Sequence, residues 1–245
     1  MKKQTNTKLQ KQKEQETIKQ WFDRTYQSRG YGYLRPLAAY EVFLSILQTI
    51  KGKALLDVAC GGGLMLKNAV NNGLMAYGID ISEEAVSMSN KLVPGANVIQ
   101  ANAEKIPFPE EKFDYLTCLG SLERFIDLSK ALEEMKRVTR KTAKFCFMVR
   151  NTNTLRWKIF REYLGIINHK AHMSARSLEE WKAVFANNGF NIINIYPDQW
   201  PIQQSKRFIT FWRKPDYHRI RSTIRPLKYS NELIFLLEKK HEQIG

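Results

Sequence analysis

The stretch from Ala54 to Leu66 constrains the fold of this chain more than any other. It reads Ala-Leu-Leu-Asp-Val-Ala-Cys-Gly-Gly-Gly-Leu-Met-Leu. The apolar run 54–58 predicts a buried strand, the glycines at 61–63 predict a tight turn, and apolar residues at helical spacing follow. Strand, glycine turn and helix form the layout of a nucleotide-binding crevice in an α/β sheet, where the first N–H groups of the helix face an anionic ligand group.

Two ligand classes use this layout, and the details of the turn distinguish them. A dinucleotide site favours G-x-G-x-x-G, which Gly61 and Gly63 begin, but Leu66 holds the third glycine position. Asp57 lies four positions before Gly61, at the end of the expected strand. A carboxylate there suits a cationic ligand end better than a pyrophosphate. S-Adenosylmethionine has such an end, because it carries an ammonium and a sulfonium.

The second expected strand, 75–80, also ends on an acid. Asp80 lies 19 positions after Gly61, close to the interval of about 20 residues at which a carboxylate meets the two hydroxyls of a ribose. A carboxylate can accept a hydrogen bond from each hydroxyl. The alternative is that Asp80 or Ser82 only caps the helix that starts near Glu83.

The motif from Asp57 to Gly63 closely resembles the first motif of the class I S-adenosylmethionine-dependent methyltransferases. Three later stretches resemble the same family in order and spacing: 102–109, the strand opening Phe113-Asp114, and 122–138. Ala59 departs from the family, which often has glycine there, and Arg124 stands where many relatives carry histidine. The resemblance covers about residues 54–150. It is greatest to the subgroup that includes quinone-biosynthesis and other small-molecule methyltransferases.

The resemblance implies a Rossmann-like, doubly wound α/β sheet of seven strands, mostly parallel, with an antiparallel last strand at the sheet edge. Residues 1–50 would form an N-terminal helical cap. Residues 51–245 would form the methyltransferase domain, with acceptor or lid elements at 151–175 and 201–229.

The residues themselves predict several further elements. Residues 1–20 are polar without apolar periodicity and predict a frayed tail that runs into a helix. Helical spacing continues within 36–50. Ser177 and Glu180 form a capping-box pattern, which predicts a helix over 177–188.

The resemblance also implies S-adenosylmethionine as the cofactor and a set of residues around it. Asn102 stands where the family has an acid that meets the adenine amino group. Its side-chain carbonyl can accept the same hydrogen bond, and an Asx turn is the alternative. Tyr26, Tyr31 or Tyr33 would face the sulfonium because aromatic faces attract cations, unless their segment only packs on the sheet edge. The expected cofactor-binding set is Asp57, Ala59, Cys60, Gly61, Gly63, Asp80, Ile81, Asn102, Ala103, Leu119, Gly120, Tyr26 and Tyr33.

Methyl transfer requires alignment of donor and acceptor and exclusion of water, and it needs a base only if the acceptor atom is a protonated oxygen or nitrogen. The candidate bases are His172, His169 and Glu123. Arg124 cannot serve, because an arginine stays protonated. Two histidines alone do not make a metal site, ordinary surface histidines are the alternative, and we expect no metal.

Charge is spread unevenly along this chain, whose net charge is +15. Residues 51–150 hold 14 basic and 12 acidic residues, whereas 151–245 hold 16 basic and 8 acidic ones. The stretch 206–228 is basic and aromatic, with Asp216 as its only acid. This pattern fits a lid over an anionic acceptor, an anionic membrane surface, RNA, or a solvated insertion.

Composition narrows the class of protein further. The polar N-terminus does not resemble a signal peptide, and no apolar run approaches the roughly 18 residues that a spanning helix needs. Cys60, Cys118 and Cys146 match no metal-site spacing. We expect a reduced, cytoplasmic protein, with peripheral membrane contact as a variant of this expectation.

These observations favour a methyltransferase that uses S-adenosylmethionine and acts on a small-molecule or lipid acceptor, including an anionic one. The alternatives are an RNA methyltransferase that uses the basic flanks, a non-catalytic module that keeps the cofactor site, and a nicotinamide-dependent enzyme. Steep salt dependence of RNA binding would favour the first alternative.

Overall fold

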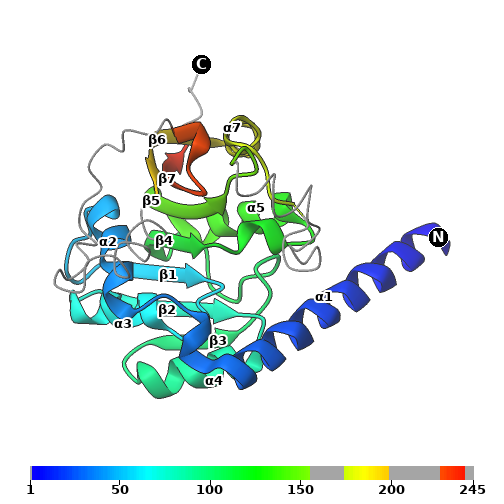
Figure 1. Cartoon of the computed structure of the whole chain (residues 1–245), viewed down its shortest axis with the longest axis horizontal. Helices are drawn as coiled ribbons and strands as arrows, with labels where there is room; N and C mark the ends of the chain where they lie inside the picture. The colour runs from blue at the N-terminus through cyan, green and yellow to red at the C-terminus, as the bar shows by residue number, and fades with distance from the viewer. Residues whose placement is uncertain (1, 155–173, 199–226, 241–245) are drawn as a thin grey trace.

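A seven-stranded sheet forms the centre of the computed structural model, which describes residues 2–154, 174–198 and 227–240 (Figure 1). The strand order is β3-β2-β1-β4-β5-β7-β6. The strands are β1 (Ala54–Val58), β2 (Met75–Asp80), β3 (Asn97–Gln100), β4 (Phe113–Leu119), β5 (Thr139–Arg150), β6 (Phe190–Pro197) and β7 (Glu232–Lys239). Strands β1 to β5 pair in parallel, and β7 is antiparallel to both β5 and β6. The predicted seven-stranded, doubly wound fold is confirmed.

The position of the antiparallel strand differs from the prediction. We expected β7 at the sheet edge, but it lies between β5 and β6, and β6 forms the edge. The burial of β7 explains this position, because Leu233 to Leu237 are all buried. A strand with a continuous buried apolar run belongs inside a covered sheet rather than at its border.

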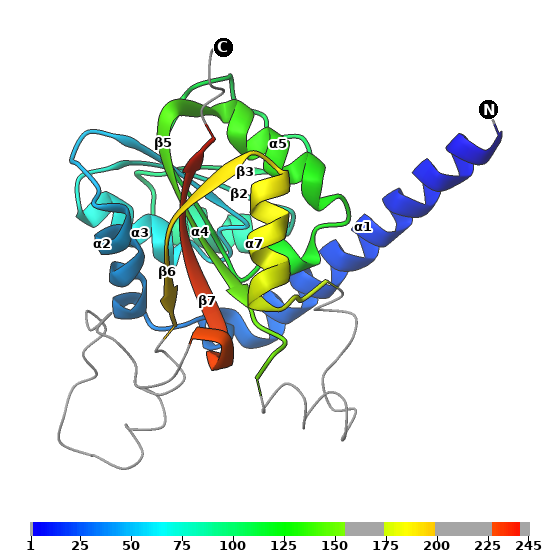
Figure 2. The same cartoon turned by 90° about the horizontal axis from the view of Figure 1, so that it is seen from above.

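Helices cover both faces of the sheet (Figure 2). On one face lie α2 (Glu41–Leu47), α3 (Leu64–Asn71) and α4 (Glu83–Leu92); on the other lie α5 (Leu128–Val138) and α7 (Leu178–Asn187). Each face buries its own apolar cluster. Phe43 and Leu66 belong to the first, and Phe147, Trp181 and Phe185 belong to the second. The α7 capping box of Ser177 and Glu180 is present, as predicted.

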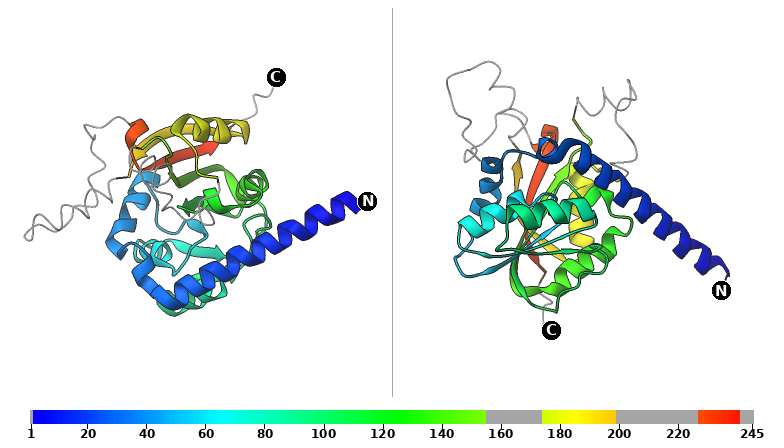
Figure 3. Two further views of the ribbon diagram at one scale, coloured as in Figure 1. Left: turned by 45° about the vertical axis from the view of Figure 1, so that its right-hand side comes forward. Right: turned by 90° about the horizontal axis from the view of Figure 1, so that it is seen from below.

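The N-terminal segment is more ordered than the sequence predicted. In place of a frayed tail, helix α1 runs from Lys2 to Arg29 and is followed by Gly30, whose φ is +49°. Good helix formers dominate this segment, and it contains neither proline nor glycine. The tail prediction failed because a helix that is polar on every side gives no apolar periodicity. The first part of α1 stands clear of the body, and its last turns pack on α4 (Figure 3).

The glycine turn joins β1 to α3 and leaves no room for side chains. Gly63 is the N-cap of α3 and has a left-handed φ of +82°. A Cβ at Gly63 would lie 2.3 Å from Ser89 Oγ on α4. The glycine therefore allows α3 and α4 to approach each other closely.

Replacement of Gly63 by alanine should destabilise the protein strongly. A left-handed alanine costs about 1–2 kcal/mol, and overpacking against Ser89 adds about 1–3 kcal/mol. We expect the free energy of unfolding in urea to fall by at least about 2 kcal/mol. Gly95→Ala is the matched control, because a Cβ at this position meets no atom within 4 Å. Equal losses in the two variants would contradict the packing argument.

Candidate functional site

Two adjoining cavities lie at the carboxyl edge of the parallel strands. The first has a volume of about 650 Å³ and lies over the end of β2. The second, of about 830 Å³, lies over the ends of β1, β4 and β5. Tyr26, Ala59, Ser121 and Arg124 line both cavities. The crevice that they form lies where ligands bind in open α/β sheets.

Asp80 connects the glycine turn to the end of β2 at the first cavity. Its Oδ2 accepts a hydrogen bond from Gly61 N–H at 2.8 Å, and its Oδ1 accepts one from Ser82 N–H at 2.9 Å. Burial raises the pKa of Asp80, and these two N–H donors oppose that rise. Ser82 caps α4 by accepting from Ala85 N–H. Of the two residues that we considered as caps of this helix, Ser82 is the cap. Asp80 lines the cavity.

Residues after β3 form another part of the first cavity. Asn102 and Ala103 line it together with Ile81. Asn102 Oδ1 accepts from Glu104 N–H at 2.9 Å, so the Asx turn that we considered as an alternative is present. The carbonyl oxygen has a second lone pair, which can accept from a ligand amino group.

Helix α1 forms the roof of the first cavity. Ile18, Phe22 and Tyr26 line it from this helix. Asp23 joins α1 to the start of α4, because its Oδ1 accepts a hydrogen bond from Ser82 Oγ at 2.6 Å. The Arg124 guanidinium lies 5.1 Å from the Phe22 ring centroid, which is a cation–π distance.

Tyr26 lies directly on the glycine turn. Its hydroxyl oxygen is 2.6 Å from the position that a Gly61 Cβ would occupy. Burial raises the pKa of Tyr26 well above its ordinary value, so its hydroxyl stays neutral. The glycine turn therefore admits a close approach by the N-terminal segment.

Asp57 lies on the wall of the second cavity and is 3% exposed. Thr117 Oγ1 donates a hydrogen bond to Asp57 Oδ1 at 2.6 Å. Burial raises the pKa of Asp57 to about 7, although the Thr117 hydrogen bond lowers it. A cationic ligand group beside Asp57 would favour its ionised form. Other predicted residues on this wall are Cys60, Gly61, Leu119, Gly120 and Tyr33.

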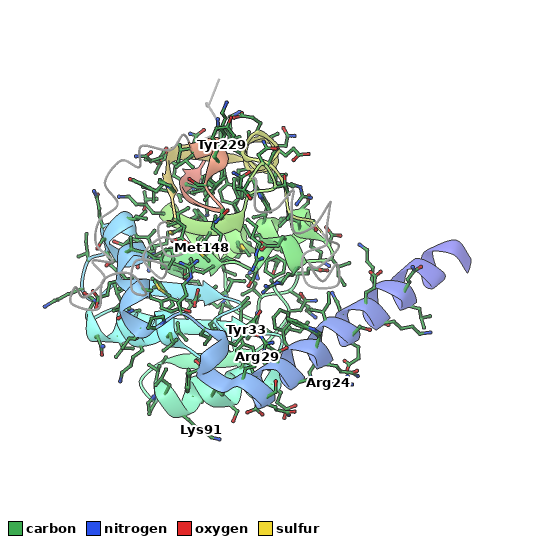
Figure 4. The ribbon with its side chains drawn as sticks, in the orientation of Figure 1. Arg24, Arg29, Tyr33, Lys91, Met148 and Tyr229 are labelled. Atoms are coloured by element: carbon green, nitrogen blue, oxygen red, sulfur yellow. The ribbon has the colours of Figure 1, made fainter. Side chains whose placement is uncertain are left out.

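Apolar and aromatic side chains also line the second cavity. They are Tyr33, Leu34, Tyr40, Phe43 and Met148. In Figure 4, Tyr33 lies near the junction of α1 with the body and Met148 lies on the central strands. Tyr31 points elsewhere, because its hydroxyl donates to the Met88 carbonyl on α4.

A charged cluster on the second cavity was not predicted. Arg35 Nη2 donates to Asp198 Oδ2 at 2.7 Å and also to Glu232 Oε2. Arg150 lies beside Glu232, with which it is paired in the β5–β7 register. Sequence reasoning missed this cluster because its members lie far apart in the chain and form no local motif. The antiparallel direction of β7 would have been the signal, since its first residue lies at the carboxyl edge of the parallel strands.

The backbone conformation of Ala59 shows how the turn accommodates this departure from the family pattern. It has a φ of +59°, in the left-handed region that favours glycine. The glycine common in relatives would adopt this conformation without strain, whereas an alanine adopts it at a cost of about 1–2 kcal/mol. The backbone of this turn is thus retained although the residue differs.

Some predicted site residues lie elsewhere. Gly63 lines neither cavity and serves the packing of α3 on α4. Glu123 is fully buried and also lines neither cavity, so it is not placed to reach an acceptor there. The two candidate bases His169 and His172 lie outside the described residues. The basic and aromatic stretch 206–228, except its last two residues, lies outside them as well.

The described part of the chain shows no candidate for a metal site or a membrane span. No group of three or more His, Cys, Asp or Glu side chains in it is placed to hold a metal ion. No helix in it is both long enough and apolar enough to cross a membrane. Cys60, Cys118 and Cys146 are buried free thiols.

Comparison with known proteins identifies similar chains. Residues 56–147 match a family model described as a methyltransferase domain. A ubiquinone biosynthesis O-methyltransferase of Pseudomonas fluorescens is 30% identical over 141 residues, which cover 54% of this chain and 59% of the relative. A demethylmenaquinone methyltransferase of Geobacillus stearothermophilus is 36% identical over 98 residues, or 37% of this chain and 42% of the relative.

A third relative has a solved structure. The uncharacterized methyltransferase YcgJ of Bacillus subtilis is 27% identical over 157 residues, which cover 61% of each chain. Its crystal structure superimposes with a TM-score of 0.59 at 21% identity and covers 84% of this chain and 99% of that one. The likeness of structure supports the fold. In sequence, the chain spans between 42% and 61% of the length of these three relatives.

The raised pKa of Asp57 predicts a pH-dependent stability. An unfolded aspartate ionises near pH 3.9, whereas Asp57 ionises at about 7 in the folded protein. The folded state therefore binds more protons between these values, and this group's contribution to stability is lost as pH rises toward 7. Asp57→Asn removes the titration and keeps an oxygen that can accept from Thr117. We expect the wild-type free energy of unfolding, relative to that of the variant, to fall from pH 5 to pH 8 in urea titrations. A difference that is independent of pH would contradict the burial of an ionisable Asp57.

Proposed function

We propose that this chain, which belongs to the class I S-adenosylmethionine-dependent methyltransferases, transfers a methyl group from S-adenosylmethionine to a small-molecule acceptor. The observation that carries the proposal is the hydrogen bond between Gly61 of the glycine turn and Asp80, which lies beside two adjoining cavities. One cavity has the polar groups that an adenosine requires. The other has a buried carboxylate for a cationic end and space for a second molecule.

The first cavity would hold the nucleoside half of the cofactor. The Asp80 carboxylate would accept hydrogen bonds from the ribose hydroxyls through lone pairs that its two N–H partners leave available. Asn102 and Ala103 would meet the adenine edge. Phe22 would cover the nucleoside from α1.

The second cavity would hold the methionine half. Ionised Asp57 would pair with the ammonium, and the aromatic rings of Tyr26 and Tyr33 would stabilise the sulfonium. The cofactor supplies a methyl carbon already activated by its positive sulfur. The protein's residues have to align the acceptor with that carbon and exclude water. The wall of the second cavity would align the acceptor. The N-terminal segment, which we propose as a helical cap, would exclude water.

The acceptor that the second cavity fits best is a hydroxylated ring. Tyr40, Phe43 and Met148 provide an apolar surface for a ring. Arg124 and Arg150 lie on the same wall, and their guanidiniums favour an acceptor whose oxygen becomes negative. The Pseudomonas relative is named for the methylation of an oxygen in ubiquinone biosynthesis, which supports a ring acceptor of this chemistry.

Loss of the Asp80 carboxylate should weaken cofactor binding. We expect calorimetry to show that Asp80→Ala lowers the affinity for S-adenosylmethionine by at least tenfold, or about 1.4 kcal/mol. Asp80→Asn keeps one acceptor oxygen and should show a smaller loss. Asp114→Asn is the control, because Asp114 bonds to Ala54 N–H at the opposite edge of the sheet. Unchanged affinity in a folded Asp80→Ala protein would remove this carboxylate from the site.

A further inference from the structure

The charged cluster on the second cavity has more carboxylates than guanidiniums. Arg35 contacts Asp198 and Glu232, and Arg150 lies 3.5 Å from Glu123 and 4.0 Å from Glu232, measured from its Nε to a carboxylate oxygen. Among the described residues the cluster thus holds three carboxylates and two guanidiniums. Asp198 and Glu232 share the Arg35 guanidinium, and a neighbouring carboxylate disfavours the ionised form of the other, so the cluster can retain a proton.

Of the three carboxylates, Glu232 faces the cavity. The side chains of Glu123 and Asp198 are 0% and 5% exposed, whereas that of Glu232 is 18% exposed. Glu232 lines the second cavity, and the other two do not. A proton that this cluster exchanges with a bound molecule would therefore pass through Glu232.

The direction of β7 brings Glu232 to the place where the acceptor would lie. The strand is antiparallel to β5, and Glu232 pairs in register with Arg150 at the end of β5. The first residue of β7 thus lies at the carboxyl edge of the sheet. It lines the same cavity as Asp57 and Gly61.

We propose that Glu232 is the general base that accepts the proton of the acceptor hydroxyl during methyl transfer. This inference rests on the proposed function. The acceptor oxygen forms a bond to the methyl carbon with one of its lone pairs, and the electrons of the broken carbon–sulfur bond go to sulfur. The hydroxyl proton passes to the Glu232 carboxylate and is later released to water. Arg35 and Asp198 act as positioning residues, because they hold the carboxylate at the cavity wall.

The surroundings of Glu232 suit proton transfer near neutral pH. Burial raises the pKa of Glu232, Asp198 adds to the rise, and Arg35 and Arg150 oppose it. The groups that face Glu232 thus come from the segment before α2, from the end of β5 and from the end of β6. A base is most effective when its pKa lies near the working pH.

Other ionisable groups on this wall are less suited to the role. Burial raises the pKa of Tyr40 to about 12, so its hydroxyl remains protonated near neutral pH. Asp57 accepts from Thr117 and would be occupied by the cofactor ammonium. Arg124 carries no lone pair that can accept a proton.

The first test needs no acceptor. The full-length protein, with glutamate labelled at the side-chain carboxyl carbon, is bound to S-adenosylhomocysteine and titrated by NMR. Glu232→Gln identifies the resonance by its absence. We expect a midpoint between about pH 6 and 8, near neutrality as a base requires. A Glu232 that stays ionised from about pH 5 to 9 would overturn the proposal. Failure of the wild-type protein to bind S-adenosylhomocysteine would instead contradict the proposed function.

The second test measures transfer of a labelled methyl group to 3,4-dihydroxybenzoate and related catechols. We expect Glu232→Gln to lower kcat by about 10²-fold or more and to abolish the acidic limb of the pH profile, with cofactor affinity unchanged within about threefold. Glu232→Asp keeps a carboxylate and should recover part of kcat. Glu238→Gln makes the same chemical change in β7 at a residue opposite Lys144, away from the cavity, and should leave the profile unchanged.

Two outcomes of the second test would contradict the inference. One is a folded Glu232→Gln protein that keeps the wild-type kcat and pH profile. The other is a wild-type protein that binds S-adenosylmethionine but methylates none of the catechols. Glu232 would then have no hydroxyl acceptor from which to take a proton. If Glu232→Gln does not fold, the comparison of Glu232→Asp with Glu238→Gln decides the same question through kcat and the acidic limb.

Discussion

The hydrogen bonds of the buried Asp80 carboxylate fix the geometry on which the rest of the site depends. One oxygen holds the N–H of Gly61 and the other holds the N–H of Ser82. Ser82 in turn caps α4 and donates to Asp23 of α1. A single carboxylate therefore connects the glycine turn, the end of β2, the start of α4 and the helix that roofs the first cavity. Removal of water from these polar groups is tolerable only because each is hydrogen-bonded.

The antiparallel β7 gives the second cavity a different character from the first. Parallel strands place their last residues at the ligand edge, whereas an antiparallel strand placed among them contributes its first residue there. Glu232 thereby meets Arg150, and the segment before α2 adds Arg35. Each charge has an opposite partner, which a buried ionic group requires. The first cavity thus offers hydrogen-bonding groups, and the second offers paired charges beside an apolar surface.

Local patterns in the sequence predicted the fold and singled out residues that line the two cavities, whose role in cofactor binding stays a prediction. The apolar run before Gly61, the spacing to Asp80 and the capping box at Ser177 are each short-range signals with a direct physical cause, and the structure contains all three elements. Two predictions about the fold were wrong and one cluster was missed, for equally physical reasons. A uniformly polar α1 carries no periodicity, the place of β7 in the sheet depends on packing across the whole domain, and the cluster of Arg35, Asp198 and Glu232 joins residues distant in the chain. Such long-range contacts leave no local pattern to read.

The most direct measurement is a crystal structure of the full-length protein with S-adenosylhomocysteine. The account predicts adenosine in the first cavity, its ribose hydroxyls within hydrogen-bonding distance of Asp80, its adenine beside Asn102 and Phe22 above it. The amino-acid end of the ligand should reach Asp57 past the Gly61 turn. A ligand bound elsewhere, or a crevice that stays closed by the side chains of α1 at saturating ligand, would contradict the assignment of this edge of the sheet as the cofactor site.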